Sequence, residues 1–151
     1  MLETAGVDIG VVVGTVHARY FQLVITGEPS HVGPTTMDRR RDSLAAAAEV
    51  ILAVERAGVA AENGGRTSAS WIQNFPNARG NVSNNTRLHC DVRHEDTERA
   101  KVMEVDLRTT ISGIAARRRV QIDVDPHTAF GPGAFEQLIV VRRSCFNLRS
   151  L

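Results

Sequence analysis

Four segments of the chain alternate apolar and polar residues with the two-residue period of strands that bury one face. The alternation predicts strands at residues 17–28 (ending near Gly27), 67–76, 86–94 and 120–125. The apolar positions expected to face a core are Phe21, Leu23, Ile25, Leu88, Cys90, Val92, Val120, Ile122 and Val124. In the second segment, the residues expected to share one face are Ala69, Trp71, Gln73 and Phe75.

Two further segments repeat apolar residues at helical spacing. The first predicted helix spans residues 37–56, with Thr36 or Asp38 as its N-terminal cap. Its apolar stripe comprises Leu44, Ala47, Ile51 and Val54, widened by Ala48 and Leu52. The second predicted helix begins after a cap at Asp96 or Thr97 and ends in the run "ARRR". Its apolar positions are Ala100, Met103, Leu107, Ile111 and Ile114.

The resulting element order is β-α-β-β-α-β, which predicts an α+β fold of the ferredoxin-like type. In this fold a four-stranded antiparallel sheet carries two helices on one face. The arrangement accounts for residues 17–125, with residues 1–16 as a connector and residues 126–151 as a tail. Because this fold hosts many functions, function must be argued from particular side chains.

Composition narrows the class of protein. The chain has 151 residues, a net charge of +1 and 42% hydrophobic residues, which is ordinary for a soluble domain. The near-zero charge gives no electrostatic reason to expect nucleic acid or a membrane surface as a partner. An RNA-binding sheet needs exposed aromatic residues, and those of this chain are expected mostly in the core. Two cysteines outside any CxxC pair, with no signal peptide or long apolar run, favour a cytoplasmic location.

His31 and an asparagine-rich loop are the first candidates for chemistry. His31 lies in the loop "EPSHVGP" between a predicted strand and a predicted helix, where it is either presented to a ligand or caps local structure. The loop "PNARGNVSNN" offers amides that could donate to an oxyanion. Asparagine and glycine also favour tight turns, so this loop has a purely structural explanation as well.

His89, Asp91 and Arg93 form a third candidate group, since their spacing places all three on one face of a strand. A His-x-Asp pair alone is too small for a zinc site, which needs three or four ligands. The alternative is a solvated polar face with an Asp–Arg ion pair of little energetic value. Arg93 differs from a lysine because its planar fork can hold a carboxylate through two hydrogen bonds.

Taken together, three stretches resemble the M20-type metal-dependent amidohydrolases. These stretches are "GVDIGVVVGTV", "VITGEPSHVGPTTMDRRRDSLAAAAEVILAVE" and "FPNARGNVSNNTRLHCDVRH". The nearest branch is the hydantoinase/carbamoylase branch, which includes N-carbamoyl-L-amino-acid hydrolases, allantoate amidohydrolases and β-ureidopropionases. The run "HVGPTTM" keeps the spacing of the family's histidine motif, and Asp91, Arg93 and His94 match the family's Asp-x-Arg-His strand. The resemblance covers residues 3–125.

The resemblance implies that residues 17–125 are the lid or dimerisation domain of such an enzyme. In the family this domain forms a homodimer and presents polar residues to an active site. By that likeness, His31 stabilises the oxyanion in the partner subunit's active site, and Arg93 binds the carboxylate of a small substrate. The family's lid asparagine falls at Gly80, so either the loop shifts by one residue and the neighbouring Asn81 serves this role, or the role is lost.

The family holds two divalent metal ions (Zn, Mn or Co) in a catalytic domain that flanks the lid. The chain is expected to carry no metal ligands, to contain no catalytic domain, and to be inactive alone toward linear amide or ureido bonds. The alternative is a stand-alone ferredoxin-like module that oligomerises or binds a small carboxylate.

Overall fold

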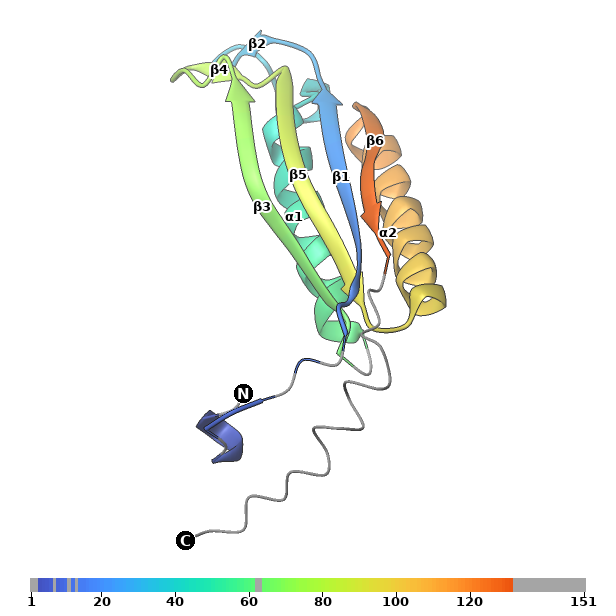
Figure 1. Cartoon of the computed structure of the whole chain (residues 1–151). Helices are drawn as coiled ribbons and strands as arrows, with labels where there is room; N and C mark the ends of the chain where they lie inside the picture. Colours follow the sequence, from blue (N-terminus) through green and yellow to red (C-terminus); the bar gives the residue numbers. More distant parts are fainter. Residues whose placement is uncertain (1–2, 7, 11, 13, 62–63, 132–151) are drawn as a thin grey trace, which may run out of the picture.

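The computed structural model describes residues 3–6, 8–10, 12, 14–61 and 64–131, and Figure 1 shows their arrangement. The strands are β1 (His17–Thr26), β2 (Ser30–His31), β3 (Arg66–Phe75), β4 (Asn81–Val82), β5 (Asn85–His94) and β6 (Gln121–Phe130). The helices are η1 (Glu3–Ala5), η2 (Met37–Arg39), α1 (Ser43–Ala60) and α2 (Thr97–Arg118).

The main sheet has the order β3-β5-β1-β6, and each neighbouring pair is antiparallel. Both long helices cover the same face of this sheet (Figure 1). The predicted α+β class is therefore confirmed, and the arrangement is consistent with the ferredoxin-like fold. No helix in the described part of the chain is long and apolar enough to cross a membrane.

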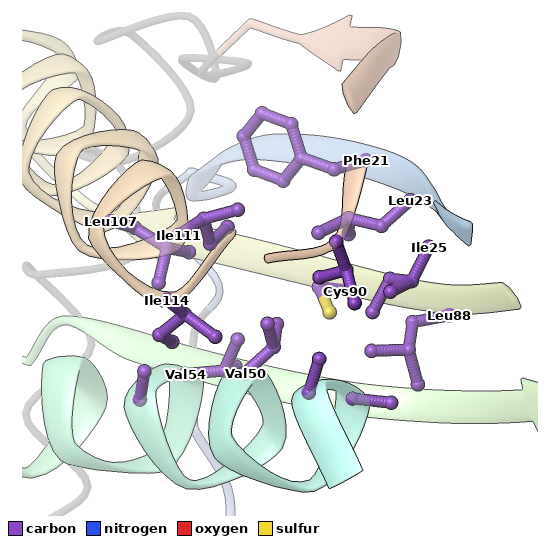
Figure 2. Packing of buried hydrophobic residues seen from close by; sticks show 14 of the residues in the cluster. Phe21, Leu23, Ile25, Val50, Val54, Leu88, Cys90, Leu107, Ile111 and Ile114 are labelled. Carbon is purple, nitrogen blue, oxygen red and sulfur yellow. The ribbon is translucent and has the colours of Figure 1, made fainter. Parts of the chain in front are cut away.

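The hydrophobic core lies between the sheet and the two helices, as Figure 2 shows. The residues predicted to point inward from β1 and β5 are buried there, namely Phe21, Leu23, Ile25, Leu88, Cys90 and Val92. Burial, followed by the nearby charge of Asp91, raises the pKa of the Cys90 thiol to about 12, so this cysteine is a poor nucleophile. Val120 is also buried, and Ile122 and Val124 pack against the core as predicted.

The beginning of α1 differs from the prediction. Residues 37–39 form a separate 3-10 turn, Arg40 is extended, and α1 starts only at Ser43. The N-terminal cap is Asp42, whose Oδ1 accepts hydrogen bonds from the amides of Leu44 (2.9 Å) and Ala45 (3.1 Å). The prediction of Thr36 or Asp38 as cap is wrong. For α2 the cap is Asp96, one of the two residues predicted.

The predicted apolar stripe of α1 is correct in part. Ala47 and Val54 are buried and Ile51 packs against the core, as predicted. The full set of buried residues of α1 is Ser43, Ala46, Ala47, Val50, Ala53 and Val54. Leu44 and Leu52, which were also placed in the stripe, are 40% and 50% exposed, and with Val59 they form an exposed apolar stripe.

A β-bulge in β3 corrects the assignment of its faces. Ala69 lies opposite Cys90, but Trp71 lies opposite His89, so Ser70 is an inserted residue between them. Ala69 therefore packs against the core, whereas Trp71 and the alternate residues after it lie on the open face. The expectation that Ala69 shares a face with Trp71 is wrong.

The aromatic residues are also more exposed than expected. Trp71 and Phe75 are each 41% exposed, and both lie on the open face of the sheet rather than toward the core. The last strand is longer than predicted, since β6 continues to Phe130. The expected start of the tail at residue 126 therefore falls inside a strand, and residues 132–151, with Cys145, lie outside the described residues.

Candidate functional site

His31 lies in a short two-stranded ladder at one end of the main sheet, which sequence patterning did not predict (Figure 1). In this ladder Ser30 is opposite Val82 and His31 is opposite Asn81. Directly opposed residues of an antiparallel pair place their side chains on the same side, with Cβ atoms about 5 Å apart. The amide of Val32 extends the ladder by donating to the carbonyl of Gly80 (2.9 Å). The structure thus brings together His31 and Asn81, two of the three predicted site residues.

The ring of His31 is held by its own loop. The amide of Gly33 donates to Nδ1 of His31 at 3.0 Å. A nitrogen that accepts a hydrogen bond carries no proton, so the neutral imidazole has its proton on Nε2. Because the side chain is exposed, this N–H is available as a donor. His31 is not a helix cap, since Asp42 has that role.

Gly33 lies in close contact with the His31 ring. A Cβ on Gly33 would lie 3.1 Å from Nδ1 and 3.2 Å from Cε1 of His31. Such contacts are tighter than usual, so the ring would have to shift slightly to accept a larger residue at this position. Sequence reasoning did not identify Gly33 as a site residue, and its position two residues after His31 was the available signal.

The side chain of Asn81 is exposed and makes a weak contact with the backbone of its own loop. Its Nδ2 lies 3.5 Å from the carbonyl oxygen of Arg79, at the limit for a hydrogen bond. The amide therefore remains available to another acceptor. Gly80, where the family's asparagine would fall, has a φ of 80°, in the left-handed region that favours glycine or asparagine. The asparagine that lies opposite His31 in the ladder is therefore Asn81, the residue after Gly80.

A buried polar network joins this end of the sheet to the core. Thr86 donates to Oδ1 of Asn74 (2.8 Å) and accepts from the hydroxyl of Ser43 (2.9 Å). Nδ2 of Asn74 in turn donates to the hydroxyl of Ser83 (2.9 Å). The amide of Ser43 also donates to the carbonyl of Ser83 (3.0 Å). These bonds fix the loop after β4 to the start of α1.

Arg93 lies on the open face, and the predicted grouping with His89 and Asp91 is confirmed by the strand register. Oδ2 of Asp91 accepts from Nε (2.7 Å) and Nη2 (2.6 Å) of Arg93. The hydrogen bond to Asp91, then its charge, raises the pKa of Arg93. The guanidinium also lies 5.7 Å from the centre of the Tyr20 ring.

The ion pair leaves part of the Arg93 fork available. Both contacts to Asp91 use the Nε–Nη2 edge of the guanidinium. Among the described residues, the Nη1 side can therefore donate hydrogen bonds to a second carboxylate. Asp91 is therefore suited to orient Arg93. His89 instead lies against Trp71, with ring centroids 4.5 Å apart.

Arg93 is far from His31 and Asn81. The β5 strand starts at Asn85, near the short ladder, and Arg93 is close to its other end. At about 3.3 Å per residue, the eight steps from Asn85 to Arg93 span roughly 26 Å. Figure 1 shows the short ladder and the far end of β5 at opposite ends of the sheet. One copy of the chain therefore does not bring all three predicted residues together.

The described residues do not fit a metal centre. Among them, no group of three or more His, Cys, Asp or Glu side chains is placed to hold a metal ion. His17 and His94 are buried and opposite each other in β1 and β5, but they are only two.

Comparisons with known proteins agree with the fold. No family profile matches the chain. It is 24% identical to an allantoate amidohydrolase of Bacillus subtilis over 131 residues, covering 87% of this chain and 32% of that protein. It is 25% identical to an N-carbamoyl-L-amino-acid amidohydrolase of Pseudomonas sp. over 150 residues, covering 97% of this chain and 36% of that protein.

A solved structure shares the whole arrangement. A hydantoinase/carbamoylase family amidase from Burkholderia vietnamiensis superposes with a TM-score of 0.90 and 30% identity, covering 95% of this chain and 35% of that one. The chain spans about a third of the length of these relatives. By sequence and by fold, the homologues and structural neighbours of this chain are the amidohydrolases of the hydantoinase/carbamoylase family.

Proposed function

We propose that this chain forms the lid and dimerisation part of a carbamoylase-like amidohydrolase, which hydrolyses linear amide or ureido C–N bonds. The observation that carries the proposal is the pairing of His31 with Asn81, with Nε2–H of the histidine directed outward. The names of the relatives, allantoate amidohydrolase and N-carbamoyl-L-amino-acid amidohydrolase, support this substrate class.

His31 and Asn81 act in this proposal as donors to the oxygen that becomes negative when the scissile carbonyl is attacked. Fixed donors of this kind lower the barrier because they require no reorganisation as the charge develops. Loss of one such donor typically reduces kcat by about 10²–10³-fold. The two divalent metal ions (Zn, Mn or Co) expected of the intact enzyme are held outside the described residues.

Arg93 binds the carboxylate of the substrate through the side of its fork that Asp91 leaves available. A carboxylate at Nη1 and Nη2 would form the bidentate pair that guanidinium geometry favours. Asp91 fixes the plane of the guanidinium, and Tyr20 supports one face of it. A substrate with a small carboxylate near the amide or ureido bond fits this arrangement.

The roughly 26 Å along β5 from Asn85 to Arg93 supports the assignment of His31 and Arg93 to different active sites. In this proposal two copies act together, and His31 of one copy completes the site of its partner. The surface suited to pairing comprises the edge strand β3 and the exposed stripe of α1. Along this stripe, Leu52 is 50% exposed and Val59 is 83% exposed. Unpaired strand edges and apolar stripes both favour association with a like surface.

An active-site complementation experiment tests the proposal. The chain replaces the matching third of the Pseudomonas N-carbamoyl-L-amino-acid amidohydrolase, and turnover is measured for the chimera and its variants. His31→Ala is expected to lower kcat about 10²–10³-fold, Arg93→Ala to raise KM, and Arg39→Ala, a nearby exposed arginine, to change neither.

Mixing the His31→Ala and Arg93→Ala chimeras provides the decisive measurement. Random pairing makes half of the dimers mixed, and each mixed dimer has one complete site, so activity should return to about a quarter of the parental value. Failure of the mixture to regain activity, while the parental chimera is active, would refute the assignment of His31 to a partner site.

The alternative of a stand-alone module that binds a small carboxylate rests on the oriented fork of Arg93. This alternative predicts that His31→Ala does not change the activity of the chimera. It also predicts that Arg93→Ala abolishes binding of a simple carboxylate by the free chain.

A further inference from the structure

We propose that Arg40 is a positioning residue that fixes His31 with Nε2–H outward. Nη2 of Arg40 donates to the carbonyl of Val32 at 2.7 Å, and Nε donates to the carbonyl of Thr35 at 3.1 Å. Both carbonyls belong to the loop that follows His31. A single guanidinium therefore ties together two points of the loop that holds the imidazole.

The two bonds act on the parts of the loop that contact His31. The amide of Thr35 donates to the backbone carbonyl of His31 (3.2 Å), and the amide of Gly33 donates to its Nδ1 (3.0 Å). The Val32 carbonyl that Arg40 holds belongs to the same peptide group as the Gly33 amide, and the Thr35 carbonyl holds the loop two residues further on, so the Gly33 amide stays aimed at the ring. Without Arg40, Val32 and Thr35 would lose their side-chain donor, and the loop could turn the Gly33 amide away.

The same guanidinium also connects His31 to the asparagine across the ladder. Val32 accepts from Arg40 through its carbonyl and donates through its amide to Gly80, the residue before Asn81. The backbone of Arg40 is extended (φ −72°, ψ 137°), so the chain is not helical between η2 and α1, and the side chain of Arg40 bonds to the loop instead.

Neighbouring arginines do not share this role. Arg41 is directed to Glu28, with 3.6 Å between Nε and Oε2, and Arg39 is exposed. Arg39→Ala therefore removes the same charge from an adjacent position without removing the two bonds to the loop. It is a matched control that separates a hydrogen-bond effect from a general effect of charge.

The inference deepens the proposed function and rests on it for its importance to catalysis, but its test needs no substrate. The free 151-residue chain is labelled with ¹⁵N, and the ring nitrogens of His31 are observed by NMR at a pH where the imidazole is neutral. Exchange of the Gly33 amide with solvent is measured on the same samples. The variants are Arg40→Ala, Arg40→Lys and Arg39→Ala, with melting curves to confirm that each is folded.

In the parent chain, Nε2 should show the shift of a protonated nitrogen and Nδ1 that of an unprotonated, hydrogen-bonded one. In Arg40→Ala the Nδ1 signal should move toward that of a free imidazole. The Gly33 amide should also exchange about tenfold faster or more, because hydrogen bonds from a charged donor are stronger than neutral ones. Arg40→Lys can reach one carbonyl at a time and should lie between these values. Arg39→Ala should match the parent chain.

Unchanged His31 signals and Gly33 exchange in Arg40→Ala would overturn the proposal, as would equal changes in Arg39→Ala. If Arg40→Ala does not fold, Arg40→Lys decides: parental His31 signals and Gly33 exchange in that variant overturn the proposal, and intermediate values support it. A failure here leaves the oxyanion role of His31 untouched, and a failed complementation experiment leaves the positioning of His31 by Arg40 untouched. The two proposals therefore fail independently.

Discussion

Replacing Asp42 with alanine should destabilise the chain, whereas replacing His31 should not. Asp42 Oδ1 accepts from two amides at the start of α1, at 2.9 and 3.1 Å, and these donors have no partner within the helix. Loss of a cap of this kind costs about 1–2 kcal/mol. For a chain of this length each kcal/mol shifts Tm by about 2–4 °C, so Asp42→Ala should lower Tm by roughly 2–8 °C.

A second variant divides this cost into its two parts. Asparagine is as good a cap as aspartate because its side-chain oxygen still accepts the amides. Asp42→Asn therefore removes only the favourable interaction of the negative charge with the helix N-terminus, worth about 0.3–1 kcal/mol. The difference between Asp42→Asn and Asp42→Ala measures the hydrogen bonds alone.

Melting curves of four variants test this reasoning, the other two being His31→Ala and Thr36→Ala. His31 is exposed, so its replacement should change stability by less than about 0.5 kcal/mol. Thr36 precedes η2 but makes no side-chain capping bond there, so its replacement should also have little effect. If His31→Ala were the most destabilising of the four, the histidine would be structural and the presentation of its Nε2–H would lose its support.

Three further predictions concern the core and the exposed helix stripe. Glu104 is buried and pairs with Arg19 at 2.6 Å and with Arg108 at 3.0 Å. Glu104→Ala should lower the free energy of unfolding in urea by about 3 kcal/mol, and Glu104→Met should recover only a small part of it, because both guanidinium groups still lose their carboxylate. Because the pKa of Cys90 is raised in the folded chain, the unfolded chain loses the thiol proton at a lower pH, so the free energy of unfolding should fall as pH rises from about 9 to about 12. Cys90→Ala should remove this contribution to the pH dependence of stability. Leu52→Glu should shift light-scattering mass toward monomer, because the side chain is exposed on the proposed pairing surface, and Tm should fall only by the stabilisation that association supplies; an unchanged mass would argue against that surface.

Periodicity predicted the main sheet well because burial acts along whole strands. In β1 and β5 every second residue contacts the helices, so the apolar pattern and the observed core agree. The same reasoning failed in β3, where one inserted residue reversed the faces. An edge strand is buried on fewer sides, so its sequence constrains register less strongly, and Ser70 gives no apolar signal of the bulge.

The face of α1 was predicted only in part. Helical spacing correctly placed Ala47, Ile51 and Val54 toward the core. The helix carries more apolar residues than one face can bury, so the same spacing also included Leu44 and Leu52, which are exposed. On α2, Glu104 is buried among apolar residues because two arginines neutralise it, and no pairwise spacing within α2 reveals Arg19 on β1.

The short ladder is different in kind, because hydrogen bonds rather than burial determine its structure. Of its four residues only Val82 is buried, with an exposed fraction of 2%. Its order comes from the Val32–Gly80 bond, the Gly33 amide on His31 and the two bonds of Arg40. None of these bonds leaves an apolar period in the sequence. The loop position indicated His31 and the family resemblance indicated Asn81, but neither predicted that the two residues lie opposite each other. A site ordered in this way keeps its donors exposed and oriented at once, which a buried side chain cannot do, and this is the property that an oxyanion donor acting on another subunit requires.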